Sequence, residues 1–206
     1  MYWTARLIAL ISAAALVVAG CGSGSSSTTS SSSGGSKPQS NEVDPNAEEK
    51  SPPGDIPDDT QFVRFSVPGG SFSVKIPEGW ARTANGSRVT FTSNLNSVAI
   101  EHQPATVALT AAGVQAKDVQ TLAHALQGFH LQSVRAIKRS GQRAIRVTYL
   151  AKSKPDPVTG KSVTDAVERY LFARNGKQAI LTLAGPNGAD NVDAWRTISE
   201  SLKWGQ

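Results

Sequence analysis

Residues 22–60 contain almost no apolar side chain, and this feature limits where a chain of 206 residues can build a core. The stretch consists mainly of serine, glycine, proline and acidic residues. It cannot bury enough apolar surface to offset the entropy that ordering would cost. We therefore expect residues 21–60 to form a disordered tether and one folded domain to span residues 61–206.

The length of residues 61–206 suits a single domain, because domains usually contain about 100–200 residues. A chain of this size buries roughly 70% of its unfolded surface when it folds. The sequence holds one cysteine, which excludes an internal disulfide framework, a Cys-x-x-Cys redox pair and a zinc site built from cysteines. The stability of the domain must therefore come from a packed apolar core.

Residues 1–20 have the pattern of a secretory signal peptide. Residues 1–6 carry one positive charge, and residues 7–18 form a nearly continuous apolar run. That run is about 12 residues long, whereas a helix that spans a bilayer needs about 20. Residues 18–21, Val-Ala-Gly-Cys, follow the run and resemble the lipobox of bacterial lipoproteins.

The lipobox resemblance implies that Cys21 becomes the mature N-terminus and that its thiol carries a diacylglyceryl group. Two acyl chains such as palmitate would hold the protein with about 20 kcal/mol, at ~0.8 kcal/mol for each buried methylene. We therefore expect a lipid-anchored protein on the extracytoplasmic face of the cell membrane. The alternative is an ordinary signal peptide that is cleaved near a chance cysteine.

Charge is divided unevenly between the tether and the domain. The whole chain has a net charge of +5, but residues 22–60 hold two lysines and seven acidic residues. Residues 61–206 hold 18 basic and nine acidic residues. This excess indicates either a solvated basic face or a weak attraction to an anionic surface such as phospholipid head groups. Nucleic acid is not an expected partner, because no nucleic-acid-binding signature accompanies the charge.

Strands are predicted by short apolar segments, several of which alternate with polar residues. Turn residues separate them in pairs, and Asn175-Gly176 is typical of a tight hairpin turn. The expected pairs are residues 62–67 with 71–76, 88–92 with 97–102, 131–138 with 144–151, and 167–173 with 178–184. Pairing between neighbours implies a largely antiparallel sheet.

Two helices are predicted from apolar residues that recur every three or four positions. The first stripe, which ends near Gly128, consists of Val119, Leu122, Leu126 and Phe129. The second, which we expect to lie on the sheet, consists of Val192, Trp195, Ile198 and Leu202. Asp190 or Asn191 is expected to accept hydrogen bonds from the first N–H groups of the second helix. The predicted class is α+β, with a largely antiparallel sheet flanked by helices.

Short motifs distributed along the domain resemble those of the PsbP-like fold. They are Ile-Pro-Glu-Gly-Trp at residues 76–80, Tyr-Leu-Phe at residues 170–172, and a final helix that starts near Asp193 and ends near Trp204. Within that fold, the sequence is most similar to actinobacterial surface lipoproteins of the LpqN type. The resemblance implies an α/β/α sandwich that serves as a binding or assembly scaffold and not as an enzyme. Apart from the lipidated cysteine, it assigns no residue a role.

Few residues suggest chemistry. The sequence contains no His-x-x-x-His, His-Glu-x-x-His, acid-rich calcium loop or Gly-x-Ser-x-Gly motif, so we predict no metal site, no cofactor and no catalytic residue. His102 is expected to be a half-buried structural residue, His124 to face solvent, and His130 to follow the helix end. Glu101 and Glu168 are either a carboxylate pair or two separate solvated acids.

Two regions are candidates for ligand binding. The first is a basic run across the Ser140-Gly141 turn: Arg135, Lys138, Arg139, Arg143 and Arg146. It either holds an anionic head group or forms a solvated hairpin end. The second lies near Trp80 and Trp195, where a pocket could hold an apolar ligand, although core packing explains the same side chains.

These features predict an envelope lipoprotein with a noncatalytic domain that binds a protein partner or a cell-envelope lipid or glycan. One alternative is an envelope-associated hydrolase with an unrecognised active site. Another is a passive spacer without a specific ligand.

Overall fold

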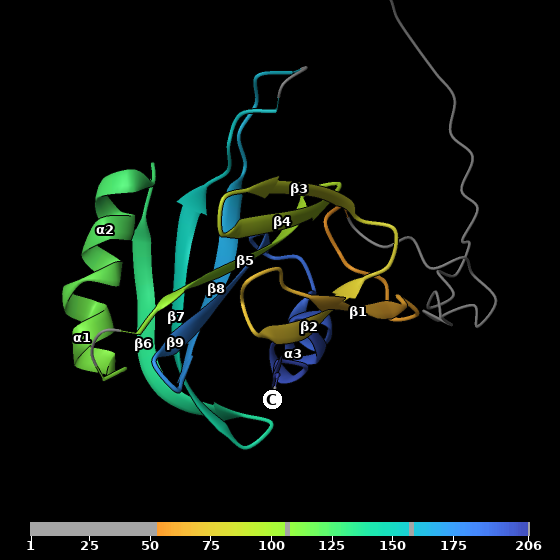
Figure 1. The fold of residues 1–206 in the computed structure, drawn as a ribbon. Coiled ribbons are helices and arrows are strands. Elements are labelled where there is room, and N and C mark those ends of the chain that lie inside the picture. Colours follow the sequence, from red (N-terminus) through yellow and green to blue (C-terminus); the bar gives the residue numbers. More distant parts are fainter. Residues whose placement is uncertain (1–52, 106–107, 157–158, 206) are drawn as a thin grey trace, which may run out of the picture. The chain divides into compact units, whose positions relative to one another are not determined.

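A seven-stranded antiparallel sheet forms the centre of the domain (Figure 1). The computed structural model describes residues 53–105, 108–156 and 159–205. The strands lie in the order β3-β4-β5-β9-β8-β7-β6, so β5 pairs with β9 across a long sequence separation. Their bounds are Ala81–Asn85 (β3), Arg88–Ser93 (β4), Asn96–Pro104 (β5), His130–Arg139 (β6), Gln142–Lys152 (β7), Thr164–Arg174 (β8) and Lys177–Pro186 (β9).

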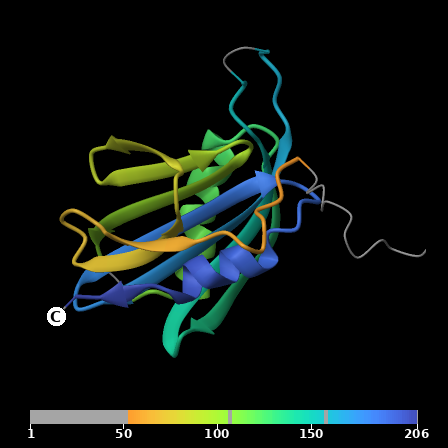
Figure 2. The same ribbon diagram turned by 90° about the vertical axis from the view of Figure 1, so that its right-hand side faces the viewer.

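A smaller sheet and three helices cover the two faces of the large sheet (Figures 1 and 2). The small sheet has the order β1-β2-β10, with β1 at Phe62–Ser66, β2 at Phe72–Pro77 and β10 at Lys203–Trp204. The helices are α1 (Ala111–Ala116), α2 (Asp118–Ala125) and α3 (Val192–Glu200). Helices α1 and α2 lie on one face, which we call the helix face. The small sheet and α3 lie on the other, the small-sheet face.

Each face of the large sheet has its own apolar core, because successive side chains of a strand point to opposite faces. On β8, Tyr170 and Phe172 join the core under the small sheet and α3, together with Val74 and Ile198. The intervening Leu171 joins the second core, which also contains Val114, Val119, Val147 and Ile180.

The four predicted strand pairs are all present as β1–β2, β4–β5, β6–β7 and β8–β9. Strands β3 and β10 and helix α1 were not predicted. The residues of β3, Ala-Arg-Thr-Ala-Asn, are all exposed, so they show no apolar alternation. Strand β10 has only two residues. The α+β class and the largely antiparallel sheet are confirmed.

Both predicted helices differ from the structure in detail. Helix α2 ends at Ala125, so Phe129 lies beyond its end, although it still packs against the core of the helix face. Val192 is 61% exposed and does not belong to the buried stripe of α3, which consists of Trp195 and Ile198. Val192 occupies the first position of the helix, where it faces solvent. None of the helices in the described ranges is long and apolar enough to cross a membrane.

The side chain of Asn191 does not cap α3 as predicted, because other groups engage it. Its Oδ1 accepts a hydrogen bond from the N–H of Ile56 at 2.8 Å, and its Nδ2 donates to the carbonyl of Gly54 at 3.0 Å. The Nδ2 of Asn96 donates to the same carbonyl at 2.8 Å. We call these contacts the amide network.

The amide network shows that the folded domain begins before the boundary predicted at residue 60. Gly54 and Ile56 are both buried, and Ile56 belongs to the core of the small-sheet face. The boundary was placed too late because the segment is held by hydrogen bonds to its backbone and by the single apolar side chain of Ile56, which is too little to show hydrophobic periodicity. Residues 1–52, which include the predicted signal peptide and most of the predicted tether, lie outside the described residues.

Candidate functional site

The basic run around the Ser140-Gly141 turn does not form one cluster. Arg135, Arg139 and Arg146 share the small-sheet face, because Arg135 pairs with Arg146 and Arg139 follows Arg135 at an even spacing. Lys138 and Arg143 pair directly with each other on the opposite face. The two faces therefore divide the predicted clamp into groups with different surroundings.

On the small-sheet face, a hydrogen-bonded cluster forms around the hydroxyl of Tyr170. This hydroxyl donates to Glu168 Oε2 and accepts from Arg139 Nη2 at 3.2 Å. Arg139 Nε also donates to Ser199 Oγ of α3 at 3.2 Å, and Arg146 pairs with Glu168 at 3.4 Å. These contacts fasten α3 to the sheet.

The Tyr170 cluster has little capacity for catalysis. Burial, together with the hydrogen bond to Glu168, raises the pKa of Tyr170 above its usual value, so the phenol stays neutral at physiological pH. The residue is fully buried, and the guanidinium of Arg139 lies over its ring. A neutral phenol without solvent access cannot serve as a base or nucleophile.

Glu101 and Glu168 do not form a carboxylate pair, because they point to opposite faces of the large sheet. Glu101 lies across from Ile180, which pairs with Leu171, and these residues are on the helix face. Glu168 lies two positions before Tyr170 on β8 and therefore shares the small-sheet face with it. Glu101 pairs with Arg88 at 2.6 Å and with Arg169 at 3.4 Å. Each carboxylate thus belongs to a separate arginine cluster.

The other residues singled out in the sequence lie apart. His102 is half-buried next to the Gly69 turn, as expected, and His124 and His130 are exposed. Trp80 and Trp195 pack in the core of the small-sheet face and line none of the cavities described below. Cys21 lies outside the described residues. Within the described ranges, no group of three His, Cys, Asp or Glu side chains could hold a metal ion.

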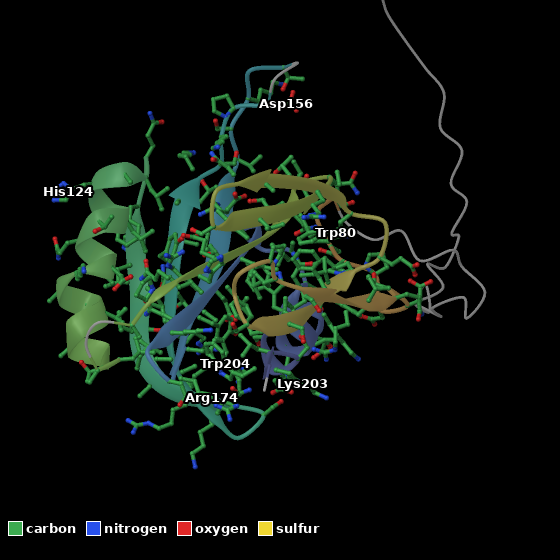
Figure 3. The ribbon with its side chains drawn as sticks, viewed as in Figure 1. Trp80, His124, Asp156, Arg174, Lys203 and Trp204 are labelled. Atoms are coloured by element: carbon green, nitrogen blue, oxygen red, sulfur yellow. The ribbon has the colours of Figure 1, made fainter. Side chains whose placement is uncertain are left out.

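A cleft of about 520 Å³, which we call the basic cleft, lies where the ends of β7 and β8 meet the C-terminal segment. Arg143, Arg174 and Lys203 line it together with Gln142. The remaining lining residues are Phe172, Ala173, Leu202 and Trp204. Figure 3 shows Arg174, Lys203 and Trp204 close together, far from the labelled His124 and Asp156.

Contacts of the C-terminal segment fix the wall of the basic cleft. Strand β10 pairs with β2, and the indole of Trp204 meets the ring of Phe72 edge-on with centroids 5.4 Å apart. Gln142 Nε2 donates to the carbonyl of Leu202 at 2.8 Å, which joins this segment to β7. The N–H of Gly205 donates to the carbonyl of Ser71 at 2.8 Å. The wall of the cleft is therefore held by strand pairing and by hydrogen bonds to β7 and to Ser71.

The charge of the basic cleft is not compensated. Arg143, Arg174 and Lys203 are exposed, and no acidic residue lines the cleft. Among the described residues, none of these three side chains takes part in an ion pair. The arginines that do so are Arg88, Arg146, Arg169 and Arg196. Such a set of cations favours an anion, to which an arginine can donate paired hydrogen bonds.

Two further cations extend the positive field beyond the cleft. Lys138 lies directly across from Arg143 on β6, and Lys177 lies directly across from Arg174 on β9. The sequence pattern indicated Arg143 and Lys138 but gave no signal for Arg174 and Lys203. These two lie far apart in the chain, and the tertiary contacts of the C-terminal segment with β2 and β7 bring them to one place. Arg174 and Lys203 are exposed cations without a distinctive sequence pattern, so they could be assigned to the cleft only once the strand pairing was known.

No protein-family model matches the chain. No curated protein matches it in sequence. Among solved structures, the domain is similar to the solution structure of the cyanobacterial PsbP protein, CyanoP, from Synechocystis, with a TM-score of 0.54 and 16% identity. The match covers 70% of this chain and 93% of CyanoP.

Two weaker similarities are to LpqN of Mycobacterium tuberculosis, described as involved in cell envelope biogenesis, and to the Ran-binding protein Mog1p of Saccharomyces cerevisiae. For LpqN the TM-score is 0.44 at 18% identity, over 72% of this chain and 92% of LpqN. For Mog1p it is 0.48 at 9% identity, over 70% of this chain and 96% of Mog1p. Of these three similarities, the one to CyanoP has a TM-score above 0.5. It shows that this chain has the PsbP-like α+β fold.

Proposed function

We propose that this protein is a noncatalytic binding protein, held on the extracytoplasmic face of a membrane through Cys21, and that its domain binds an envelope constituent at the basic cleft. The Val-Ala-Gly-Cys motif at residues 18–21 supports the anchor. The basic cleft supports the binding role. Lipid, glycan and protein are the ligand classes that such a location makes available.

The uncompensated charge of the basic cleft is the observation that carries this proposal. A domain that needs cations only for solubility can scatter them over its surface, where nearby acids and solvent screen them. Here three cations instead line one cleft, whose apolar part includes Phe172 and Trp204. A few polar groups around an apolar depression are typical of a ligand site. The buried Tyr170 cluster offers no comparable access, so the structure favours binding over hydrolysis.

Photo-crosslinking from the cleft tests the proposal in the full chain. Ala173 is exposed and lines the cleft, so a photoreactive residue placed there should capture the ligand in membranes of the producing cells. Ala84 of β3, which is exposed and lines no described cavity, is the matched control position. Mass spectrometry of the adducts should show a lipid, glycan or protein that is captured from position 173 and not from position 84.

Two results would contradict the proposed function. The first is the absence of any adduct specific to position 173. The second is turnover of an ester or glycoside substrate by the purified full chain, with loss of that turnover when residues of the cleft are replaced. The second result would identify an enzyme instead of a binding protein.

A further inference from the structure

A second cavity, which we call the apolar pocket, adjoins the basic cleft. It has a volume of about 250 Å³. Apart from the two residues that it shares with the cleft, its lining consists of Ala108, Leu109, Ala136, Ala144 and Ile145. The shared residues are Arg143 and Ala173, so the two cavities meet at these side chains. All lining residues of the pocket except Arg143 are apolar.

The two cavities lie on different sides of the large sheet. Phe172 belongs to the core of the small-sheet face, and with Trp204 it lines the basic cleft. Leu109 and Ile145 belong to the core of the helix face, and both line the apolar pocket. A ligand that occupied both cavities would therefore pass around the end of β7 and β8, with Arg143 at the junction.

The geometry points to an amphiphilic ligand, a lipid whose anionic phosphate head group lies in the basic cleft and whose acyl chain enters the apolar pocket. This inference rests on the proposed function and names its ligand. Three unpaired cations match a phosphate that carries net negative charge. An apolar chain gains free energy from an apolar pocket but none from the charged rim. Trp204 is half-buried at the cleft, where its amphipathic indole suits the level of a lipid head group.

The volumes agree with such an occupant. Ligand pockets usually measure about 300–1,000 Å³, and the basic cleft and the apolar pocket together fall within that range. A glycan would leave the apolar pocket without a matching group. A free anion would use the cations but would gain nothing from Leu109 and Ile145. The membrane to which the chain is expected to be anchored supplies phospholipids in excess.

The test uses the full chain with Cys21→Ser, which has no acyl chains of its own to compete for the pocket. The probes are monomeric dihexanoyl phosphatidylglycerol, which is anionic, dihexanoyl phosphatidylcholine, which is zwitterionic, and inorganic phosphate. Calorimetric titration measures the affinity for each. We expect the anionic lipid to bind more tightly than the zwitterionic lipid, and both lipids more tightly than phosphate, because phosphate makes no apolar contact.

Variants then assign each part of the ligand to a cavity. The pair Arg174→Gln/Lys203→Gln should weaken binding of the anionic lipid about 25-fold, at roughly fivefold for each cation removed. The pair Lys154→Gln/Lys161→Gln removes the same charge from exposed positions in the loop between β7 and β8 and should have little effect. Ala136→Phe should fill the apolar pocket and weaken lipid binding without changing the affinity for phosphate. Ala84→Phe, the same change on β3, should leave both affinities unchanged.

Two outcomes would overturn the inference. Equal affinities for lipid and phosphate, together with no effect of Ala136→Phe, would show an anion site without a lipid chain. No binding of any probe would exclude the phospholipid. The proposed function would still stand in either case if crosslinking from position 173 captured another envelope constituent.

Discussion

The hydroxyl of Tyr170 lies at the centre of a hydrogen-bonded cluster that reaches α3 through Arg139. This hydroxyl bridges Glu168 and Arg139, and Arg139 reaches Ser199 on the helix. The Nε atoms of Arg146 and Arg169 are buried without a hydrogen-bond partner among the described residues. Because each unsatisfied group already costs stability, the loss of a further hydrogen bond nearby should lower the free energy of unfolding. Buried polar clusters of this kind hold secondary-structure elements in one arrangement. A substitution within such a cluster usually destabilises the fold.

Replacing Tyr170 with Phe should destabilise the domain by about 1–3 kcal/mol, because Glu168 and Arg139 each lose a buried hydrogen-bond partner. Chemical denaturation monitored by tryptophan fluorescence measures the loss. Tyr149→Phe is the matched control. Tyr149 is also buried, with 3% exposure, but its hydroxyl makes no hydrogen bond with the described residues. Equal losses in the two variants would show that the Tyr170 cluster does not stabilise the fold.

The burial of Asp165 should make the free energy of unfolding depend on pH. Burial raises the pKa of Asp165 from 3.8 to about 6. Its Oδ1 has no hydrogen-bond partner among the described residues. The folded state therefore binds the proton more tightly than the unfolded chain does. The stabilising contribution of this proton is complete below about pH 4 and is lost as the pH rises through about 6.

At neutral pH, Asp165→Asn should raise the free energy of unfolding by about 1 kcal/mol, a value reduced for the partial exposure of the side chain. The difference between wild type and variant should disappear below about pH 4, where both side chains are neutral. Urea unfolding across this pH range measures it, with the exposed Asp58→Asn as control. A variant that is less stable than wild type at neutral pH would contradict the prediction.

The residues of the basic cleft illustrate what a sequence reveals of a site. Arg143 belonged to a predicted cluster, but the alternation of side chains along β6 and β7 separates it from Arg139 and Arg146. Arg174 and Lys203 carried no local signal. The site depends on which strands lie side by side, and hydrophobic periodicity does not specify the order of strands.

Among the elements, the N-terminal segment, β5 and α3 are joined by the amide network. Asn96 lies on β5 and Asn191 immediately precedes α3, and their side chains bond to each other at 3.0 Å. Both also donate to the carbonyl of Gly54. Gly185 on β9 lies directly against them, since a Cβ at this position would come within 2.3 Å of Asn96 Oδ1 and 2.7 Å of Asn191 Nδ2.

Gly185→Ala should therefore destabilise the domain by roughly 1–3 kcal/mol, because the added methyl group must displace both amides. The loss should be smaller in an Asn96→Ala background, where one of the clashing atoms is absent. Thermal unfolding of the two single variants and the double variant measures this coupling. Strictly additive effects would show that Gly185 does not act through Asn96.

The elements with strong periodicity were predicted and the others were not. Each of the four hairpins contains a strand with several buried side chains at alternate positions, as in Phe72, Val74 and Ile76 of β2. Strand β3 has no buried residue, and α1 has only Val114. Tertiary contacts, which a sequence pattern does not reveal, determine where β3 and α1 form. The capping role assigned to Asn191 failed for a similar reason, because a distant segment engages its amide.

Across the whole domain, charge changes sign along the direction of α3. Asp190 and Asp193 lie at the start of the helix, where they line a small cavity together with Asp58. Lys203 follows the end of the helix and lines the basic cleft. This arrangement places acids at the positive end of the helix dipole and a cation at the negative end. No acidic residue lines the basic cleft, so anion binding there should weaken as salt screens its cations.

Replacing Cys21 with Ser should release the full chain from membranes of the producing cells, because no acyl chain can then be attached. Detergent phase separation and intact-mass analysis of both forms measure this effect. The wild-type protein should carry the added mass of a diacylglyceryl group and enter the detergent phase. Ser25→Ala, a change close to Cys21 that spares the thiol, should behave as wild type. An unmodified wild-type polypeptide in the aqueous phase would refute the anchor.

The amide network has a mechanical consequence if the protein is fastened at one end and loaded at the other. Tension applied through the N-terminal segment would reach the domain at Gly54 and act first on a few side-chain hydrogen bonds. The large sheet, with its continuous backbone ladders, would resist such a pull far longer. Under load the segment before β1 should detach from the domain while the basic cleft keeps its shape. The N-terminal connection would then become longer, and ligand binding would be preserved.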